Sequence, residues 1–345
     1  KEIHRNVCIP FDIYNFIRYT DKEEYLAEYG LEVLIAIARF WAQRVNWSAE
    51  KEKYVILGVT GPNEYENNVN NNWYTNTIAV WCLKFTIEAI KIVKEKKESR
   101  LAEIITITKL DLINEQKKWQ DIIEKMYYPV DEKLSIFLQQ DGYLDKEQVL
   151  VKDLPAADRP LNQQWSWDRI LRSCFIKQAD VLQGLYFFEE DYDLETIHRN
   201  YDFYEPRTVH ESSLSPCVHA IIAAKIGDID RAYEFFLRTA RLDLDNYNND
   251  TEDGLHITSM AGTWLSVVEG FGGMRVKNDQ LYLNPVLPKN WKTYAFKVTF
   301  RQALITVKVE AGLISLTNES DKFILINVLG EEQKLHSNEM VKLKI

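Results

Sequence analysis

The chain has 345 residues and a net charge of −10, which results from 42 basic and 52 acidic residues. Apolar residues make up 46% of the chain and aromatic residues 12%, which is enough for a large buried core and argues against intrinsic disorder. The acidic balance argues against nucleic acid as a partner, since phosphate neutralisation needs a basic stripe, and no apolar run reaches the roughly 18–20 residues of a membrane-spanning helix.

The first part of the chain, as far as about residue 270, is predicted to be mainly helical. Residues 20–23 have the pattern of a capping box, and apolar residues follow it at helical spacing as far as Trp41. A second helix is predicted from about Tyr74. A third is predicted over residues 170–188, where apolar side chains recur with the helical period.

The later helical region carries start and stop signals. Ser215 followed by Pro216 is typical of a helix N-terminus. Gly227 is typical of a helix end, and Asp228 is suited to cap the next helix. With a further short helix over residues 262–269, about eight or nine helices joined by long polar and aromatic loops favour a helical toroid with a site at one mouth.

The pattern changes after about Gly272, where short alternating or β-branched runs are separated by proline and glycine. We therefore expect a helical domain over residues 1–272 and a small antiparallel β domain over residues 273–345. The predicted strands are residues 281–283, 296–301, 303–310, 313–317 and 323–329.

The most unusual segment is residues 58–76, in which five asparagines occur within residues 67–72 and an aromatic pair follows. It is either an Asn-rich surface turn that caps the next helix through Asn72, or the wall of a sugar site. In the second interpretation amides bridge vicinal hydroxyls and rings such as Trp73 stack on C–H faces. Glu64 is then the carboxylate presented to the substrate.

Lys177 and Gln178 lie in a stretch that is otherwise apolar. A lysine at a core-facing position needs a partner or a function, because burying an unpaired ammonium group is costly. The alternative is that Lys177 extends its amine to the surface.

Two further segments combine polar groups with the start of a helix, where free backbone N–H groups favour anions. The first, residues 210–216, contains more polar side chains than helix capping needs. The second, residues 253–264, combines an imidazole, hydroxyls and a small-residue turn. A lone histidine such as His256 would usually be structural. The hydroxyl and glycine beside it at a helix start also support a functional role. The candidate residues are Glu211, Ser212, Ser213, His256, Ser259 and Gly262.

Together, and in this order, the four segments resemble the motifs of the family-65 glycoside hydrolases and phosphorylases. Residues 61–76 resemble the general-acid motif of that family, and residues 177–180, 208–216 and 253–264 resemble its later motifs. Many relatives carry Asp and His where this chain has Asn63 and Glu66, and the Asn/Glu variant is associated with members that act on maltose.

The resemblance implies an (α/α)6 barrel followed by a β domain. The Trp-Asp motif found early in the family's barrel is missing, and the sequence starts at Lys1 without a methionine. We therefore expect a mainly α chain, a piece of a longer protein, in which an incomplete (α/α)6 toroid precedes the small antiparallel β domain.

The activity that the resemblance implies is inverting phosphorolysis of an α-glucosidic disaccharide, above all of maltose, to β-glucose 1-phosphate and glucose. Alternatives are a kojibiose- or trehalose-type phosphorylase, an acid-trehalase-like hydrolase, or an inactive sugar-binding fragment. Phosphate replaces the base that an inverting hydrolase needs, so one acid is enough. We expect Glu64 to be that acid.

By the same resemblance, Lys177 and Gln178 bind the donor glucose and Glu211 lies toward the acceptor. Asn72 and Trp73 belong to the sugar-binding wall. Phosphate would be held by Ser212, Ser213, His256, Ser259 and Gly262.

The implied partners are a disaccharide and phosphate, the latter as co-substrate, with no metal, organic cofactor, nucleic acid or membrane. Relatives commonly dimerise, so a homodimer is expected for the full-length protein. The four cysteines are far apart and have no CxxC spacing, which favours a reducing compartment and a cytoplasmic location.

Overall fold

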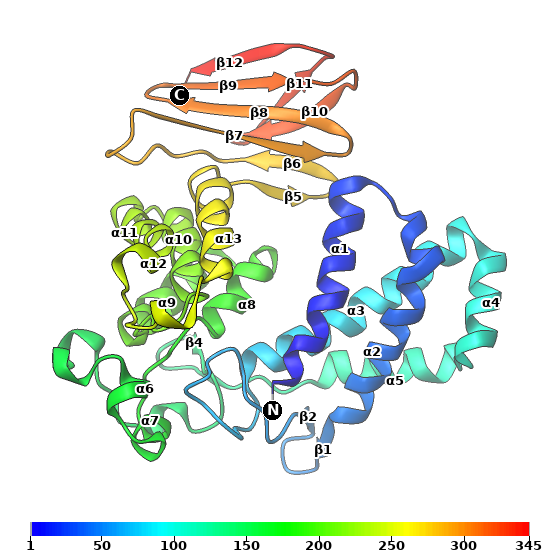
Figure 1. The fold of residues 1–345 in the computed structure, drawn as a ribbon. Helices are drawn as coiled ribbons and strands as arrows, with labels where there is room; N and C mark the ends of the chain where they lie inside the picture. Colours follow the sequence, from blue (N-terminus) through cyan, green and yellow to red (C-terminus); the bar gives the residue numbers. More distant parts are fainter. Residues whose placement is uncertain (1, 345) are drawn as a thin grey trace. The chain divides into compact units, whose positions relative to one another are not determined.

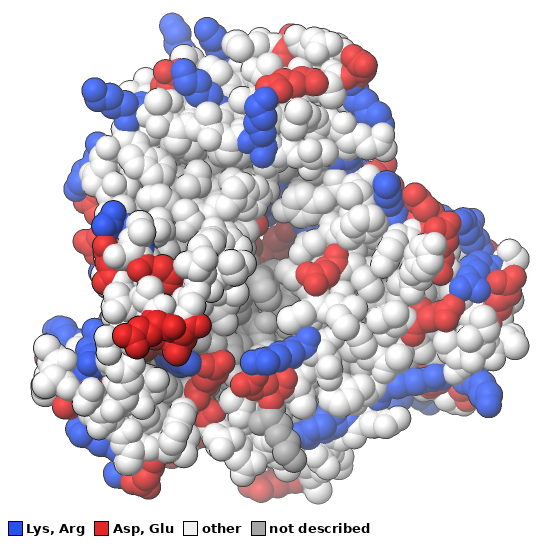
Figure 2. Space-filling view, in the orientation of Figure 1, with Lys and Arg blue, Asp and Glu red and all other residues white. Residues whose placement is uncertain are grey.

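A computed structural model of the chain describes residues 2–344, which fall into two compact units. The first unit comprises Lys1–Ile17 and Lys22–Val209, and the second comprises Arg18–Asp21 and His210–Ile345. Their helices and strands are labelled in Figure 1. On the face shown in Figure 2, basic and acidic side chains are interspersed. Within residues 2–344, no helix has both the length and the hydropathy that crossing a membrane requires.

The first unit is mainly helical, with α3 at its centre. This helix contacts α2, α4, α5 and α8 and buries most of its side chains along its whole length. Two short antiparallel hairpins, β1 with β2 and β3 with β4, lie between the helices. The helices are α1 (Cys8–Thr20), α2 (Leu31–Arg44), α3 (Trp73–Lys96), α4 (Glu98–Thr108), α5 (Leu112–Lys125), α6 (Leu161–Gln164), α7 (Trp167–Arg172), α8 (Val181–Phe187) and α9 (Leu194–Tyr204), and the hairpin strands are β1 (Asn46–Ser48), β2 (Lys53–Val55), β3 (Val130–Asp131) and β4 (Ile136–Phe137).

The single helix predicted over residues 170–188 is wrong. Helix α7 ends at Arg172 and α8 begins at Val181. Between them the main chain is paired across the unit: Ile176 N donates to Arg207 O at 3.0 Å, and Val209 N donates to Ile176 O at 2.8 Å. The segment between α7 and α8 is apolar because it is buried in an extended conformation. A short apolar run of this kind cannot be distinguished from a buried helix by its periodicity.

The second unit begins with helices whose ends match the predicted signals. Gly227 ends α10 with φ of 91°, and the side chain of Asp228 accepts a hydrogen bond from Arg231 N at the start of α11. Helix α13 starts earlier than predicted and continues as a π-helix, Ser266–Phe271. The helices are α10 (Ser215–Ile226), α11 (Ile229–Ala240), α12 (Leu242–Asp245) and α13 (Ile257–Leu265).

Eight strands follow and form two four-stranded sheets, in the orders β11-β10-β6-β5 and β12-β9-β8-β7. Alternate residues of β7 are buried, which is the pattern that predicted the strand. A β domain after a mainly helical part is therefore confirmed. The strands are β5 (Arg275–Lys277), β6 (Gln280–Leu283), β7 (Thr293–Phe300), β8 (Ala303–Glu310), β9 (Leu313–Asn318), β10 (Ile324–Val328), β11 (Glu331–Leu335) and β12 (Met340–Lys344).

The β domain departs from the prediction of a purely antiparallel arrangement at one pair, because β10 runs parallel to β6. The chain leaves the first sheet after β6, forms β7 to β9 in the other sheet and then returns as β10. Because β6 and β10 are not joined by a hairpin, which would make them antiparallel, they can pair in parallel. The strands that were not predicted, β5, β11 and β12, lie at sheet edges and carry charged residues, which weakens the alternating pattern.

Candidate active site

The asparagine loop, residues 58–72, connects β2 to α3 and is closed by main-chain pairing. Val59 and Val69 exchange two hydrogen bonds, with N–O distances of 2.9 and 2.8 Å. Asn68 and Asn71 adopt the left-handed conformation, with φ of 57° and 53°, which asparagine tolerates better than most residues. Part of the asparagine content therefore has a conformational cause.

The end of the loop is built into the start of α3. Asn72 Oδ1 caps the helix by accepting from Thr75 N at 2.8 Å, and Asn72 Nδ2 donates to Gln139 O at 3.1 Å. Trp73 is only 1% exposed and stacks on Phe137, with ring centroids 4.7 Å apart. Both side chains serve the fold, and for Asn72 this is the helix-capping interpretation. A direct contact of either residue with a sugar stays a prediction.

Glu64 is presented to solvent because both of its neighbours point into the interior. Tyr65 is 1% exposed and packs in a buried cluster that includes Phe175 and Val209. Asn63 is fully buried. The side chain of Glu64 is 34% exposed. The loop thus holds this carboxyl at the surface on a backbone that is anchored on either side.

Lys177 and Gln178 contact the same stretch of the loop, although Lys177 is 113 residues from Glu64 in sequence. Lys177 Nζ lies 2.6 Å from Glu64 Oε2, and Lys177 N donates to Asn63 Oδ1 at 2.9 Å. Gln178 Nε2 donates to Pro62 O at 2.8 Å. Three predicted site residues therefore lie together: Glu64 on the asparagine loop, and Lys177 and Gln178 on the segment that connects α7 to α8, not on the predicted helix.

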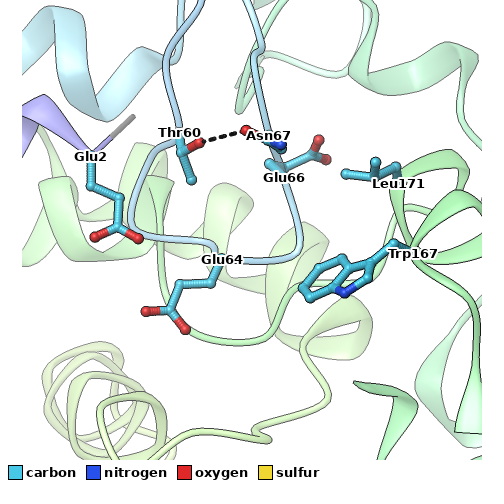
Figure 3. A pocket seen from close by; sticks show the side chains of 7 residues that line it. All are labelled: Glu2, Thr60, Glu64, Glu66, Asn67, Trp167 and Leu171. Carbon is cyan, nitrogen blue, oxygen red and sulfur yellow. Dashed lines mark hydrogen bonds between the residues drawn. The ribbon is translucent and has the colours of Figure 1, made fainter. Parts of the chain in front are cut away.

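Glu64 also lines a cavity of about 600 Å³, and Figure 3 shows it there with the indole of Trp167 from α7. Trp167 is 58% exposed, and Thr60 Oγ1 donates to Asn67 Oδ1 at 3.3 Å beside it. An aromatic face together with hydroxyl, amide and carboxylate groups is typical of the lining of a sugar-binding site. The other lining residues are Glu2, Thr60, Glu66, Asn67 and Leu171.

Behind this cavity, Glu66 forms a buried ion pair. Glu66 Oε1 lies 2.7 Å from Lys146 Nζ, and the two side chains are 4% and 14% exposed. Burial raises the pKa of Glu66, while the charge of Lys146 and hydrogen bonds from Lys146 and Gln140 act in the opposite direction. Lys146 also donates to Leu171 O, so the pair connects the asparagine loop to the end of α7.

The predicted anion-binding residues lie in the second unit. Ser212 Oγ accepts from Leu214 N at 3.2 Å, and Ser213 Oγ shares a hydrogen bond of 2.7 Å with Thr258 Oγ1 of α13. Glu211 is 6% exposed. The serine turn and the start of α13 thus lie side by side, as a shared anion site would need.

His256 is held between two carboxylates. Its Nδ1 lies 2.5 Å from Asp243 Oδ1, and its Nε2 lies 3.5 Å from Asp250 Oδ2. The hydrogen bonds from His256 lower the pKa of Asp243. An anion that binds at Nε2 takes the place of Asp250, so phosphate binding by His256 stays a prediction.

Ser259 and Gly262 have structural partners within α13 and its neighbours. The Ser259 hydroxyl is buried and donates to Thr239 O at 2.7 Å. A Cβ atom at Gly262 would come within 2.8 Å of the Cβ of Cys217, so the glycine permits close packing of α13 on α10. These contacts account for both residues without a ligand, and their role toward phosphate stays a prediction.

Sequence reasoning missed three residues around Glu64. Glu66 was noted only as a variant within the motif, and Trp167 has no sequence signal beyond an aromatic residue after a capping serine. Asp180 belongs to a recognised segment but received no role, because it was placed on a helix. In the described part of the chain, no group of three His, Cys, Asp or Glu side chains is arranged to hold a metal ion.

Comparison with known protein families gives two matches. The glycosyl hydrolase family 65 central catalytic domain matches residues 1–265, and the C-terminal domain of the same family matches residues 274–335.

Three individual proteins illustrate the similarity. Maltose phosphorylase from Bacillus subtilis (strain 168) is 54% identical over 90% of this chain and 40% of its own length, and α,α-trehalose phosphorylase from Thermoanaerobacter brockii is 37% identical over 94% and 41%. The solved structure of a putative kojibiose phosphorylase from human microbiome superposes with a TM-score of 0.90 at 36% identity, over 99% of this chain and 46% of that one. The chain spans less than half the length of these relatives.

Proposed function

The chain belongs to glycosyl hydrolase family 65, and we propose that it is the part of a disaccharide phosphorylase that carries the general acid. The observation that carries this proposal is the assembly of Glu64, Lys177 and Gln178 beside a cavity lined by Trp167. Helix and loop residues from distant parts of the sequence converge there on one half-exposed carboxyl.

In the proposed reaction Glu64 protonates the glycosidic oxygen while phosphate attacks C1 from the opposite face. The C1–O bond to the acceptor breaks, a C1–O bond to phosphate forms, and the anomeric configuration inverts. The products are β-glucose 1-phosphate and the free acceptor sugar. A second catalytic carboxylate is unnecessary because phosphate is itself the nucleophile.

Lys177 links the acid to the donor sugar in this proposal. Its ammonium group lies 2.6 Å from the Glu64 carboxyl. A donor hydroxyl that accepts from Lys177 would release the Glu64 carboxyl toward the leaving oxygen. Gln178 Nε2 donates to Pro62 O, and Gln178 Oε1 is buried without a hydrogen-bond partner among the described residues, so contact with a sugar hydroxyl requires this side chain to move.

Maltose is the substrate that we propose first. The 54% identity to the maltose phosphorylase of Bacillus subtilis supports it, as does the Asn63 and Glu66 variant of the acid motif. The relatives named for trehalose and kojibiose are the alternatives within the family. Phosphate is proposed to bind at Ser212, Ser213, His256, Ser259 and Gly262, with Glu211 toward the acceptor.

We further propose a homodimer for the full-length protein and a cytoplasmic location, the latter supported by four cysteines that are all free thiols. A domain boundary near residue 272 is supported by the family matches, which end at residue 265 and resume at residue 274.

The test is incubation of the protein, in its natural full length, with maltose in the presence and absence of phosphate. Equal amounts of β-glucose 1-phosphate and glucose, formed only with phosphate, are the expected result, and proton NMR reports the anomer. Glucose released without phosphate would show a hydrolase instead. Saccharide binding without turnover would show a binding module.

A further inference from the structure

Asp180 is a carboxyl group beneath the asparagine loop to which no role has been assigned. It lies one residue before α8 and is 2% exposed. At such a position an aspartate ordinarily caps the following helix, yet its side chain makes no capping hydrogen bond. The carboxyl is turned instead toward the loop that carries Glu64.

The carboxyl of Asp180 accepts its hydrogen bonds from that loop. Asn63 N donates to Oδ2 at 3.1 Å, and Asn72 Nδ2 lies 2.9 Å from Oδ1 and 3.1 Å from Oδ2. The loop is thereby tied down immediately before Glu64 and again at its last residue. A carboxylate is well suited to this task, because it only accepts hydrogen bonds.

The fit between the loop and this carboxyl is close. A Cβ atom at Gly61 would lie 2.4 Å from Asp180 Oδ2 and 2.4 Å from Asn72 Nδ2, so the backbone can approach only as glycine. On the other side of the acid, Asn63 Oδ1 accepts from Tyr65 N at 3.1 Å. Asp180 is therefore one of the groups that fix the main chain at Glu64, together with the hydrogen bonds from Lys177 N to Asn63 Oδ1 and from Gln178 Nε2 to Pro62 O.

The surroundings of Asp180 disfavour its charge. Burial raises its pKa to about 7, while the hydrogen bonds from Asn72 and Asn63 act to lower it and the nearby charge of Glu66 raises it further. The other titratable groups that face it are Tyr74 of α3 and Tyr204 of α9. The group that anchors the loop therefore changes its charge near neutral pH.

We propose that Asp180 is a positioning residue, whose carboxyl oxygens fix the asparagine loop and so hold Glu64 in place for proton transfer. Asn63 N and Asn72 Nδ2 both donate to this carboxyl, so replacing one of its oxygens by a donor leaves the loop held less firmly. The inference rests on the proposed function in so far as Glu64 is the acid. The contacts that carry it do not depend on the identity of the substrate.

The experiment compares the natural full-length protein with its Asp180→Asn variant, which keeps the shape of the side chain but replaces an acceptor by a donor. Asp193→Asn is the matched control, because Asp193 caps α9 at the surface by accepting from Thr196 N at 2.6 Å. Hydrogen exchange of the peptides that cover residues 58–72 and the kinetics of maltose phosphorolysis are both measured between pH 5.5 and pH 8.5, that is, about 1.5 units either side of 7.

For Asp180→Asn we expect faster exchange of residues 58–72 and a kcat lower by about tenfold to a hundredfold, because small misplacement of a catalytic group has effects of this size. The KM for maltose should change by less than about threefold. The exchange protection of residues 58–72 in the wild type should weaken as the pH rises through about 7, because the buried site disfavours the charged form, and this step should be missing in the variant. Asp193→Asn should behave as the wild type in each measurement.

A merely structural role would predict a change in stability without a change in kcat at equal folded fraction, and that result overturns the proposal. Unchanged exchange of residues 58–72 in Asp180→Asn overturns it as well. If the wild type shows no phosphorolysis of maltose, the proposed function fails, and the exchange data still decide for or against Asp180. The variant Asn72→Asp with Asp180→Asn restores one donor–acceptor pair and should recover part of the protection.

Discussion

The asparagine loop with its partners around Asp180 and Lys177 differs in construction from the serine and histidine segments of the second unit. In the loop, amides and a carboxyl are buried and bonded across more than 100 positions of sequence, as between Asn63 and Asp180. In the second unit, Ser213 bonds Thr258 at an exposed position and His256 is bonded to aspartates within 13 residues.

This difference teaches that two segments proposed to bind substrates can be prepared to different degrees. Buried, fully bonded polar groups fix a geometry, because any movement leaves a donor or an acceptor unpaired in the interior. Exposed hydroxyls and an imidazole with two acidic partners can exchange those partners for a ligand at low cost. We therefore expect the acid side to be fixed before substrate arrives and the anion side to form with phosphate.

The change with the largest expected effect is Glu64→Gln. Loss of a general acid typically lowers a rate by about 10²–10⁴-fold, and we expect this for phosphorolysis of maltose. The side chain is 34% exposed, so the fold should be intact, which circular dichroism and thermal unfolding would show. Near-normal turnover by Glu64→Gln would show that Glu64 is not the general acid. The comparison of the asparagine loop with the second unit would then no longer concern catalysis.

The second prediction concerns stability and Asp180. Its pKa is raised from 3.8 to about 7 in the folded chain, so the folded state binds this proton more tightly than the unfolded chain does. The contribution of Asp180 to the free energy of unfolding is therefore largest below about pH 4 and is lost as the pH rises through about 7, by at most about 4 kcal/mol.

Urea unfolding as a function of pH would measure this effect. The slope between pH 4 and pH 7 should become smaller in Asp180→Asn than in the wild type, with Asp193→Asn as the control. An identical slope in the two proteins would contradict the assigned titration and weaken the view of the loop as a buried hydrogen-bonded network.

The third prediction is that Lys177→Met lowers kcat/KM for maltose by about tenfold to a hundredfold, the size expected for loss of a hydrogen bond to a charged group. The substitution removes the charge and keeps the aliphatic stem. Lys152→Met, at an exposed position away from this cavity, is the control. If the substitution changed only the KM for phosphate, Lys177 would be assigned to phosphate binding and not to the donor sugar.

The smallest expected effect tests the second unit. His256→Ala should raise the KM for phosphate by about threefold to tenfold, with less change in the KM for maltose, because one partly buried ligand among several contributes about 1 kcal/mol. Initial rates at varied phosphate and fixed maltose are the measurement. An unchanged KM for phosphate would leave His256 with a structural role between Asp243 and Asp250.

The sequence predicted well those features that depend on neighbouring residues. The strand predicted over 303–310 is found as β8, because its alternating pattern reports burial of one face. Gly227 and Asp228 mark the end of α10 and the start of α11 for similarly local reasons. Residues 170–188 were misjudged, since a buried extended segment and a buried helix can have the same apolar composition.

For the candidate site, the sequence identified Glu64, Lys177 and Gln178 through motifs, but it did not show that they touch. It indicated a cap or a sugar ligand for Asn72, and the structure shows the cap together with a bond to Asp180. The role of Asp180 had no local signal, because an aspartate before a helix has the same appearance whether it caps that helix or supports a distant loop.

The amino-acid sequence by itself indicated the family through the resemblance of its four motifs. It determined the order of a helical part and a β domain and the ends of several helices through short-range periodicity and capping residues. Only the tertiary structure decided which side chains meet: the ion pair of Glu64 with Lys177, the parallel pairing of β6 with β10, and the three hydrogen bonds at Asp180. The reason is physical, since such contacts join segments far apart in the chain and are selected by burial and hydrogen-bond satisfaction of the whole fold.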